Sequence, residues 1–207
     1  MNARQLIAQA LTALAAAVRA TRRGAAEAVQ AAGRTAARFV PTWRIVETVR
    51  VAGWYEVEYI APDGTTGWRH RFPNVVTTVG GNDLLDKYMA GSGYTAAWYL
   101  GLIGTTGYSA TAAGDTMSSH AGWTESVVYS NSTRVAVSWN SAASKSKAST
   151  TCTFNINGTD TIKGAFLTTG SAKSGTTGTL YSAGTFTGGD QAVSNGGTLN
   201  VTYTASV

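Results

Sequence analysis

Hydrophobic and polar residues follow two different periods along this chain of 207 residues. Residues 3–40 are dominated by Ala, Leu and Arg, which have high helix propensity. Pro41 ends this region, because the residue before a proline is disfavoured in the helical conformation. From residue 42 onward the period is two, which is typical of half-buried strands. The pattern predicts an N-terminal α-helical arm over residues 1–41 and a β-rich domain over residues 42–207.

The apolar positions of the arm form a weak seam. They are spaced four, three and four residues apart, with one place skipped at Thr21, as at the a and d positions of a coiled coil. The seam is thin and rich in alanine, so the helix is expected to need a partner, either further copies of the chain or a larger assembly. Folding back on the β domain is the alternative, and Gly24 and Gly33 could divide the helix in two. The seam consists of Ile7, Leu11, Leu14, Val18, Ala25 and Ala32.

The first strands of the β domain, in the hairpin region of residues 42–73, have a predictable register. Asp63-Gly64 is a strong signal for a two-residue hairpin turn. A turn there places oppositely charged residues across from each other on one face and aromatic residues on the other, and both kinds of pair stabilise a hairpin. The pairs are Glu58–Arg69 and Glu56–Arg71 on the first face, and Tyr59–Trp68, Val57–His70 and Tyr55–Phe72 on the second.

Residues 74–207 are expected to form a sandwich that contains one short helix. After a strand over 74–79, Asn82 has the residue type of a helix N-cap and Gly91 that of a helix stop, which predicts a helix over 82–90. Its apolar residues are Leu84, Leu85, Tyr88 and Met89. The Gly80-Gly81 pair is interpreted as a turn, because the pattern of a phosphate-binding loop is missing.

The remaining strands indicate the fold class. Residues 95–103 predict a strand buried on both faces, and a long polar loop follows it. Residues 141–150 are expected to be a flexible connection, and alternating segments continue to the C-terminus. The fold predicted is mainly β: an antiparallel β-sandwich, jelly-roll or Greek-key-like, preceded by the helical arm. The alternating segments are RVAVSW, TCTFNI, TIKGAFLTT, GTLYSAGTF and TLNVTYTA.

Residues 115–125 hold the residue types that an enzyme would use, but the pattern indicates a structural role. Asp115 has the residue type of an N-cap, which predicts one helical turn over 116–121, with His120 at its C-terminal end and Trp123 starting a strand. No second histidine, serine elbow or metal-ligand spacing completes a site. The single cysteine, Cys152, alternates with apolar residues and is predicted to be buried. We therefore expect no enzymatic activity, no metal and no cofactor.

The positive charge of the chain is concentrated in the arm. Residues 1–40 carry six arginines against Glu27 alone, whereas residues 41–207 carry ten basic and ten acidic residues. A basic arm is suited to nucleic acid, a membrane surface or an acidic protein face. No apolar stretch approaches the roughly 18 residues of a membrane span.

Five stretches between Asn74 and the C-terminus are NVVTTVGGNDLLDKYMAG, AAWYLGLIG, AGDTMSSHAGWTE, IKGAFLTTGSAKSGTTGTLYSAGTF and LNVTYT. Together they resemble a family of structural proteins of tailed bacteriophages. Members of this family are virion components that resemble tail fibres or capsid fibres, and the resemblance implies no catalytic residues. The arm lies outside the resemblance.

The resemblance and the arm together predict a non-enzymatic virion protein, made in the bacterial host cytoplasm. We expect a capsid-associated decoration, cement or head-fibre protein, a homotrimer, whose arm contacts the major capsid protein, another virion protein or packaged DNA. The alternative is a tail-fibre or tail-tip protein that binds host glycans through Trp123 and Trp139. The arm residues predicted to bind the partner are Arg4, Ile7, Leu11, Leu14, Val18, Arg19, Arg22 and Arg23.

Overall fold

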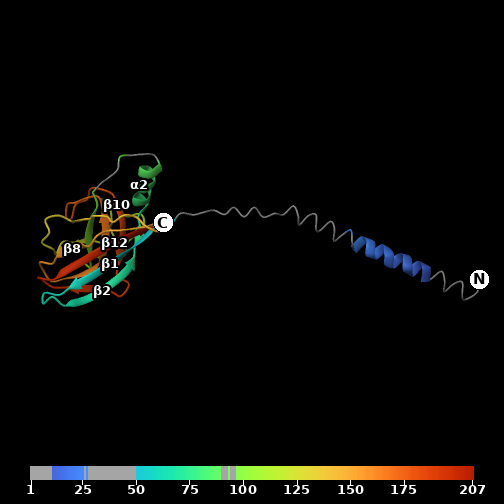
Figure 1. The fold of residues 1–207 in the computed structure, drawn as a ribbon, viewed down its shortest axis with the longest axis horizontal. Coiled ribbons are helices and arrows are strands. Elements are labelled where there is room, and N and C mark those ends of the chain that lie inside the picture. The colour runs from blue at the N-terminus through green and yellow to red at the C-terminus, as the bar shows by residue number, and fades with distance from the viewer. Residues whose placement is uncertain (1–10, 26, 28–49, 90–92, 94–96) are drawn as a thin grey trace, which may run out of the picture. The chain divides into compact units, whose positions relative to one another are not determined.

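The protein is described by a computed structural model, which places residues 11–25, 27, 50–89, 93 and 97–207 (Figure 1). The chain divides into two units, Met1–Thr48 and Val49–Val207. In the first unit, residues 11–25 and 27 are helical. Gly24 lies within this helix, so the predicted division there is wrong. Gly33, Pro41 and the two ends of the predicted arm lie outside the described residues.

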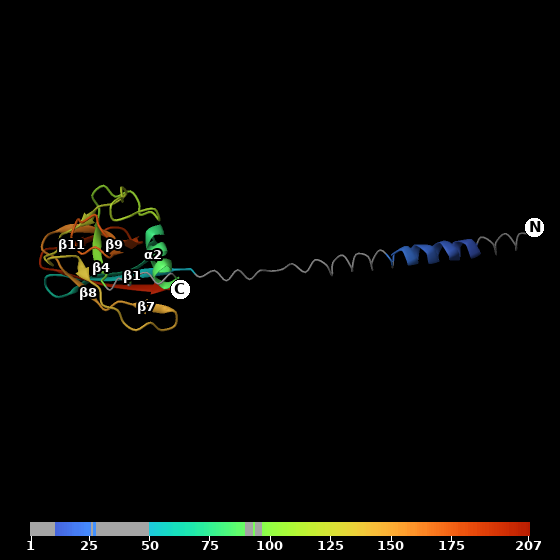
Figure 2. The same ribbon diagram turned by 90° about the horizontal axis from the view of Figure 1, so that it is seen from above.

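The second unit is built from two antiparallel sheets, and the predicted fold class is confirmed. In the first sheet, β1 lies between β2 and β12, while β7 and β8 both pair with β12. Figure 2 shows this layer, with β1 and β7, opposite a second layer that holds β4, β9 and β11. The strands of the first sheet are β1 (Ala52–Ile60), β2 (Thr66–Pro73), β7 (Ser146–Ala148), β8 (Cys152–Asn155) and β12 (Thr198–Ser206).

The second sheet is organised around β9, which pairs with β4 and with both β10 and β11. Strands β5 and β6 pair with β4, and β3 pairs with β10. The helix α2 (Thr78–Met89) follows β3 and packs against β10. The strands are β3 (Val75–Val76), β4 (Tyr99–Gly104), β5 (Glu125–Ser126), β6 (Val135–Ala136), β9 (Asp160–Thr168), β10 (Leu180–Thr185) and β11 (Gln191–Val193).

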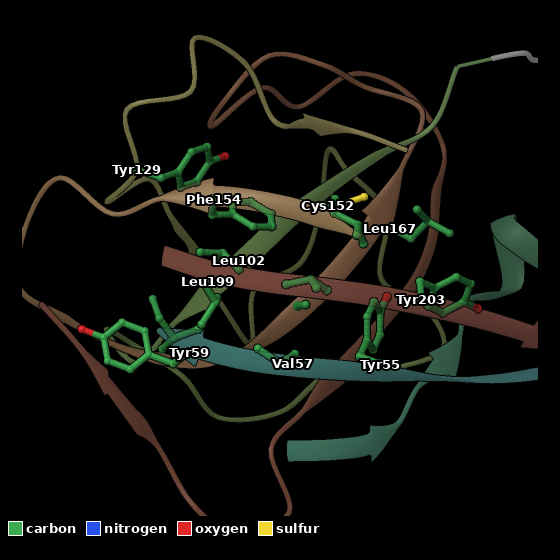
Figure 3. Packing of buried hydrophobic residues seen from close by; sticks show 14 of the residues in the cluster. Tyr55, Val57, Tyr59, Leu102, Tyr129, Cys152, Phe154, Leu167, Leu199 and Tyr203 are labelled. Atoms are coloured by element: carbon green, nitrogen blue, oxygen red, sulfur yellow. The ribbon is translucent and has the colours of Figure 1, made fainter. Parts of the chain in front are cut away.

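The main hydrophobic core lies between the two sheets, and Figure 3 shows part of it. Tyr55 and Tyr203 of the first sheet are fully buried, with ring centroids 4.9 Å apart, and Leu102 and Leu167 of the second sheet belong to the same cluster. Cys152 is 2% exposed within it, as its alternation with apolar residues predicts.

A smaller core covers the outer face of the second sheet. Ile103 and Phe166 point to that face, where Met117 and Trp123 from the loop over residues 105–124 bury them. This explains why β4 is buried on both faces, as predicted. Gly101 is required opposite Phe166, since a Cβ at Gly101 would lie 2.2 Å from the ring. The long polar loop is thus a third layer of the fold.

The predicted register of the first hairpin is confirmed for all five pairs. The loop itself is longer than two residues: Ala61 N donates to Thr65 O at 2.8 Å and Gly64 N donates to Ala61 O at 2.9 Å. Gly64 adopts φ +83°, the conformation needed in a three-residue turn of this kind. A shift in pairing after Tyr59 compensates for the extra residue, so the two faces stay as predicted.

The helix α2 begins earlier than predicted. Thr77, not Asn82, is the N-cap, because Thr77 Oγ1 accepts a hydrogen bond from Gly80 N at 3.0 Å. The strand predicted over 74–79 is therefore limited to β3. Gly80 is not in a turn but inside the helix, where a Cβ would lie 2.5 Å from the carbonyl oxygen of Tyr181. Gly91 lies outside the described residues.

Two further predictions of local structure are wrong. Residues 116–121 form no helical turn, because Thr116 and Ser119 exchange two backbone hydrogen bonds of 2.9 and 3.2 Å in a tight turn. Residues 141–150, expected to be a flexible connection, instead contain a hairpin whose second strand is β7. Its tip, Ser144 and Lys145, has φ of 50° and 59°, which non-glycine residues adopt rarely and which suits a two-residue hairpin turn.

Candidate functional site

The polar residues of the segment 115–125 are engaged with the fold itself. Asp115 Oδ2 accepts hydrogen bonds from Ala112 N and from Trp123 Nε1, both at 2.9 Å. The His120 ring stacks on the indole of Trp123 with centroids 3.9 Å apart, and its Nδ1 lies 2.9 Å from the carbonyl oxygen of Trp123. Trp123 is 2% exposed against Phe166. The predicted glycan contact at Trp123 is therefore wrong, because the side chain is part of the core.

The last residue of this segment, Glu125, forms a buried ion pair with Arg134. Arg134 and Glu125 are 2.8 Å apart, and their side chains are 1% and 5% exposed. Glu125 also accepts a hydrogen bond from Ser174 N at 2.6 Å, and Arg134 donates to the carbonyl oxygens of Gly170 and Gly175, each at 2.9 Å. The pair ties β5 to the loop after β9. No sequence signal marks it, because Arg134 stands at a position that alternation assigns to the exposed face.

The described residues contain no cluster of three or more His, Cys, Asp or Glu that could hold a metal ion. Burial raises the pKa of the Cys152 thiol to about 11, which disfavours the thiolate. The thiol lies within 3.6 Å of the carbonyl oxygens of Ala136 and Thr150. Cys152 therefore packs as an apolar residue.

The predicted charge ladder is present on the outer face of the first sheet. Arg69 Nε donates to Glu58 Oε1 at 2.7 Å, and Arg71 and Glu56 are 3.6 Å apart. The guanidinium of Arg71 also lies over the Trp54 ring, 4.3 Å from its centroid. His70 lies on the other face, with its ring centroid 5.3 Å from that of Phe186. The carboxylates are thus matched one to one by cations.

An apolar pocket of about 340 Å³ opens at the end of the sandwich, where β9 ends and β10 begins. Two aromatic pairs line it: Trp98 and Tyr181, with ring centroids 5.5 Å apart, and Trp139 and Tyr203, 6.1 Å apart. Trp139 is half-buried and borders the pocket. The other lining residues are Asp83, Leu84, Lys87, Tyr88, Lys147, Leu167 and Ala205.

The charged groups at the pocket form an ion pair or hydrogen bonds to the backbone of the domain. Asp83 and Lys87 form an ion pair of 3.4 Å on α2. Lys87 Nζ also donates to Gly93 O at 2.9 Å, and Lys147 Nζ donates to Asn140 O at 2.8 Å. The pocket therefore presents mainly aromatic and aliphatic walls.

An exposed apolar surface on α2 adjoins the pocket. We call it the α2 stripe: Leu84, Leu85, Tyr88 and Met89, which are 37%, 58%, 85% and 76% exposed. The helix packs on the sheet through Gly80 and not through the stripe. Gly80 lies so close to the backbone of Tyr181 that a Cβ there would be 2.5 Å from the carbonyl oxygen. The apolar residues of α2, visible in the sequence, are thus directed mostly to solvent. An exposed apolar patch next to a pocket is typical of an interaction site.

The predicted docking residues of the arm are described in part. Leu11, Leu14 and Val18 lie on one face of the N-terminal helix, because they are three and four residues apart, and they are 62%, 62% and 44% exposed. Arg19, Arg22 and Arg23 are exposed on the same helix. Arg4 and Ile7 lie outside the described residues.

No described helix combines the length and the apolar character needed to cross a membrane. Among known proteins, no protein-family model matches the chain. No curated protein sequence matches it either.

Proposed function

We propose that the chain is a non-enzymatic structural component of a tailed-phage virion, a capsid-associated decoration, cement or head-fibre protein. In this proposal the N-terminal helix docks on the shell, and the β-sandwich covers or projects from it. The observation that supports the docking role most directly is the exposed face of Leu11, Leu14 and Val18, which lies on the same helix as three exposed arginines.

The two kinds of surface on the helix suit a protein partner. Burial of an apolar face would supply affinity, and the arginines would be complementary to an acidic face of the major capsid protein or of another virion protein. Packaged DNA is the partner that the arginines alone would favour, and binding to it would weaken steeply with salt. Homotrimeric assembly would multiply weak contacts into stable attachment.

The test is binding to shells that lack the protein, measured by co-sedimentation. Leu14→Glu places a charge in the apolar face and is expected to weaken binding at least about tenfold, because a buried leucine contributes roughly 1.5–3 kcal/mol. Ala16→Glu is the matched control, since it adds the same charge about half a helical turn away. Equal binding by both variants and the unaltered chain would contradict docking by this face.

Recognition of host glycans, as in a tail-fibre or tail-tip protein, is the second candidate function. It is favoured by Trp139, which borders the aromatic pocket together with Trp98. Titration with host polysaccharide should then quench tryptophan fluorescence, and Trp139→Ala should remove most of that change. An unchanged spectrum at saturating polysaccharide would eliminate this candidate.

A further inference from the structure

The α2 stripe concentrates exposed apolar side chains on one short element. Leu85, Tyr88 and Met89 are each more than half exposed, and Leu84 and Tyr88 also border the pocket. Apolar surface of this kind is costly to leave in water and generally marks an interaction site. Stripe and pocket are continuous, since two residues belong to both.

We propose that the α2 stripe is a contact between copies of this chain, each copy packing its stripe against the stripe and the pocket mouth of a neighbour. The contact does not depend on attachment to a shell and should form in the purified protein. In a closed symmetric assembly the same residues of neighbouring copies meet near the axis. The stripe supplies the apolar centre of such an interface, and Tyr88 supplies an aromatic anchor.

The charges around the stripe are complementary to a second copy. Asp86 is exposed on α2 and forms no ion pair with another described residue. On the other side of the pocket, Lys147 donates only to a backbone carbonyl, and Lys145 is exposed at the hairpin tip. Among the described residues, the α2 side of the site thus carries a carboxylate without a counter-ion, and the hairpin side carries ammonium groups without one. A surface with both signs can match its own copy, which favours self-association over a partner of one charge.

Other occupants fit the site less well. The aromatic walls would attract a cation, but Lys87 and Lys147 outnumber the one carboxylate, Asp83. A saccharide needs several polar groups directed at its hydroxyls, whereas the charged groups here already bind each other or the backbone. An apolar side chain of a neighbouring copy requires neither an excess of carboxylates nor polar groups directed at it.

The experiment compares the full chain with Leu85→Glu by sedimentation velocity over a range of concentrations. The unaltered chain is expected to associate, and Leu85→Glu to raise the dissociation constant between copies at least about tenfold. Leu85 is 58% exposed, so the fold should be retained, which the thermal unfolding temperature would verify. Val127→Glu is the matched control, because Val127 is an exposed valine away from the stripe, and it should associate normally.

A second variant tests the geometry directly. Leu85→Cys should form a disulfide between copies under mild oxidation, because the stripes meet. The native Cys152 does not interfere, since it is 2% exposed in the core. Val127→Cys should remain largely uncrosslinked.

Three results would overturn the proposal. The first is an unaltered chain that stays monomeric at every concentration. The second is association that Leu85→Glu leaves intact and Leu14→Glu removes, which would place the contact in the N-terminal helix. The third is a monomer whose tryptophan fluorescence responds to saccharide and loses that response in Leu85→Glu, which would assign the site to a glycan. Loss of shell binding alone, with association intact, would count against the proposed function and not against this contact.

Discussion

Glu125 and Arg134 carry opposite charges into the interior of the β domain, where each satisfies the hydrogen-bonding groups of the other. Arg134 also donates to the carbonyl oxygens of Gly170 and Gly175, and Glu125 accepts from Ser174 N, so both side chains of the pair hold the loop after β9. Charged residues are seldom buried unless they are paired in this way. Among single residues, substitution of this pair and ionisation of the buried tyrosines are expected to change stability most.

Glu125→Gln should destabilise the domain by about 3–5 kcal/mol, because it leaves the Arg134 guanidinium buried without a counter-charge. Glu56→Gln is the control: its partner Arg71 is 3.6 Å away and both side chains are more than half exposed, so the loss should stay below about 1 kcal/mol. Urea unfolding measures both free energies. Similar losses of unfolding free energy in Glu125→Gln and Glu56→Gln would contradict the difference in burial between the two ion pairs.

The buried tyrosines predict a loss of stability at alkaline pH. Burial raises the pKa of Tyr55, Tyr129, Tyr181 and Tyr203 above the ordinary value of 10.0, with added repulsion from Glu125 at Tyr129 and from Asp83 at Tyr181. Below pH 10 these phenols are protonated in both the folded and the unfolded state. Above pH 10 only the unfolded state releases their protons, so the free energy of unfolding falls as pH rises.

Absorbance at 295 nm follows this titration. These four tyrosines should ionise together with unfolding, in one cooperative step above pH 10. A gradual titration of these four tyrosines near pH 10 in the folded protein would be incompatible with their burial.

At the scale of elements, substitution of the two candidate N-caps of α2, Thr77 and Asn82, should affect stability differently. Thr77→Ala removes the hydrogen bond that Gly80 N donates to Thr77 Oγ1 and the one that Thr77 Oγ1 donates to Leu180 O, and should cost about 1–2 kcal/mol. Thr77→Ser keeps the hydroxyl and should cost little. Asn82→Ala should be neutral or slightly stabilising, because Asn82 is exposed inside the helix and alanine has the higher helix propensity. Thermal unfolding measures the stability of each variant. A larger loss of stability for Asn82→Ala than for Thr77→Ala would favour Asn82, the cap predicted from sequence.

Elements whose signals are local and agree with one another were predictable from sequence. In the first hairpin, the turn, the charge pairs and the aromatic pairs all indicate one register, and a one-residue slip would reverse both faces, so even a longer loop leaves the pairing unchanged. The strand β4 and the position of Cys152 follow from hydrophobic pattern in the same way.

Elements that depend on distant contacts were not predictable. The start of α2 is set by Thr77, which is held to the backbone of β10 more than a hundred residues away, while Asn82 offers an equally good local signal. Residues 116–121 carry capping residue types, but Asp115 is used to hold the Trp123 indole. The same holds for the candidate site, since the pocket joins α2 to strands from both sheets.

For the whole molecule, the division into two units coincides with a division of charge. Met1–Thr48 carries seven arginines against two glutamates, whereas Val49–Val207 carries nine basic and nine acidic residues. The net charge of +5 therefore belongs to the first unit. All buried hydrophobic residues of the described chain lie between Tyr55 and Tyr203. The second unit thus supplies the hydrophobic core that stabilises the fold, and the first unit supplies the net positive charge.

Removal of residues 1–48 should consequently separate the two properties. The unfolding temperature of Val49–Val207 is expected to stay within about 2–4 °C of that of the full chain, a range that corresponds to roughly 1 kcal/mol for a domain of this size. Retention on a heparin column should be lost, because the remaining unit has no net charge. The full chain should elute earlier as salt rises, since screening weakens exposed charges. A truncated unit that melts much lower, or that heparin still retains, would show that the two units share these roles.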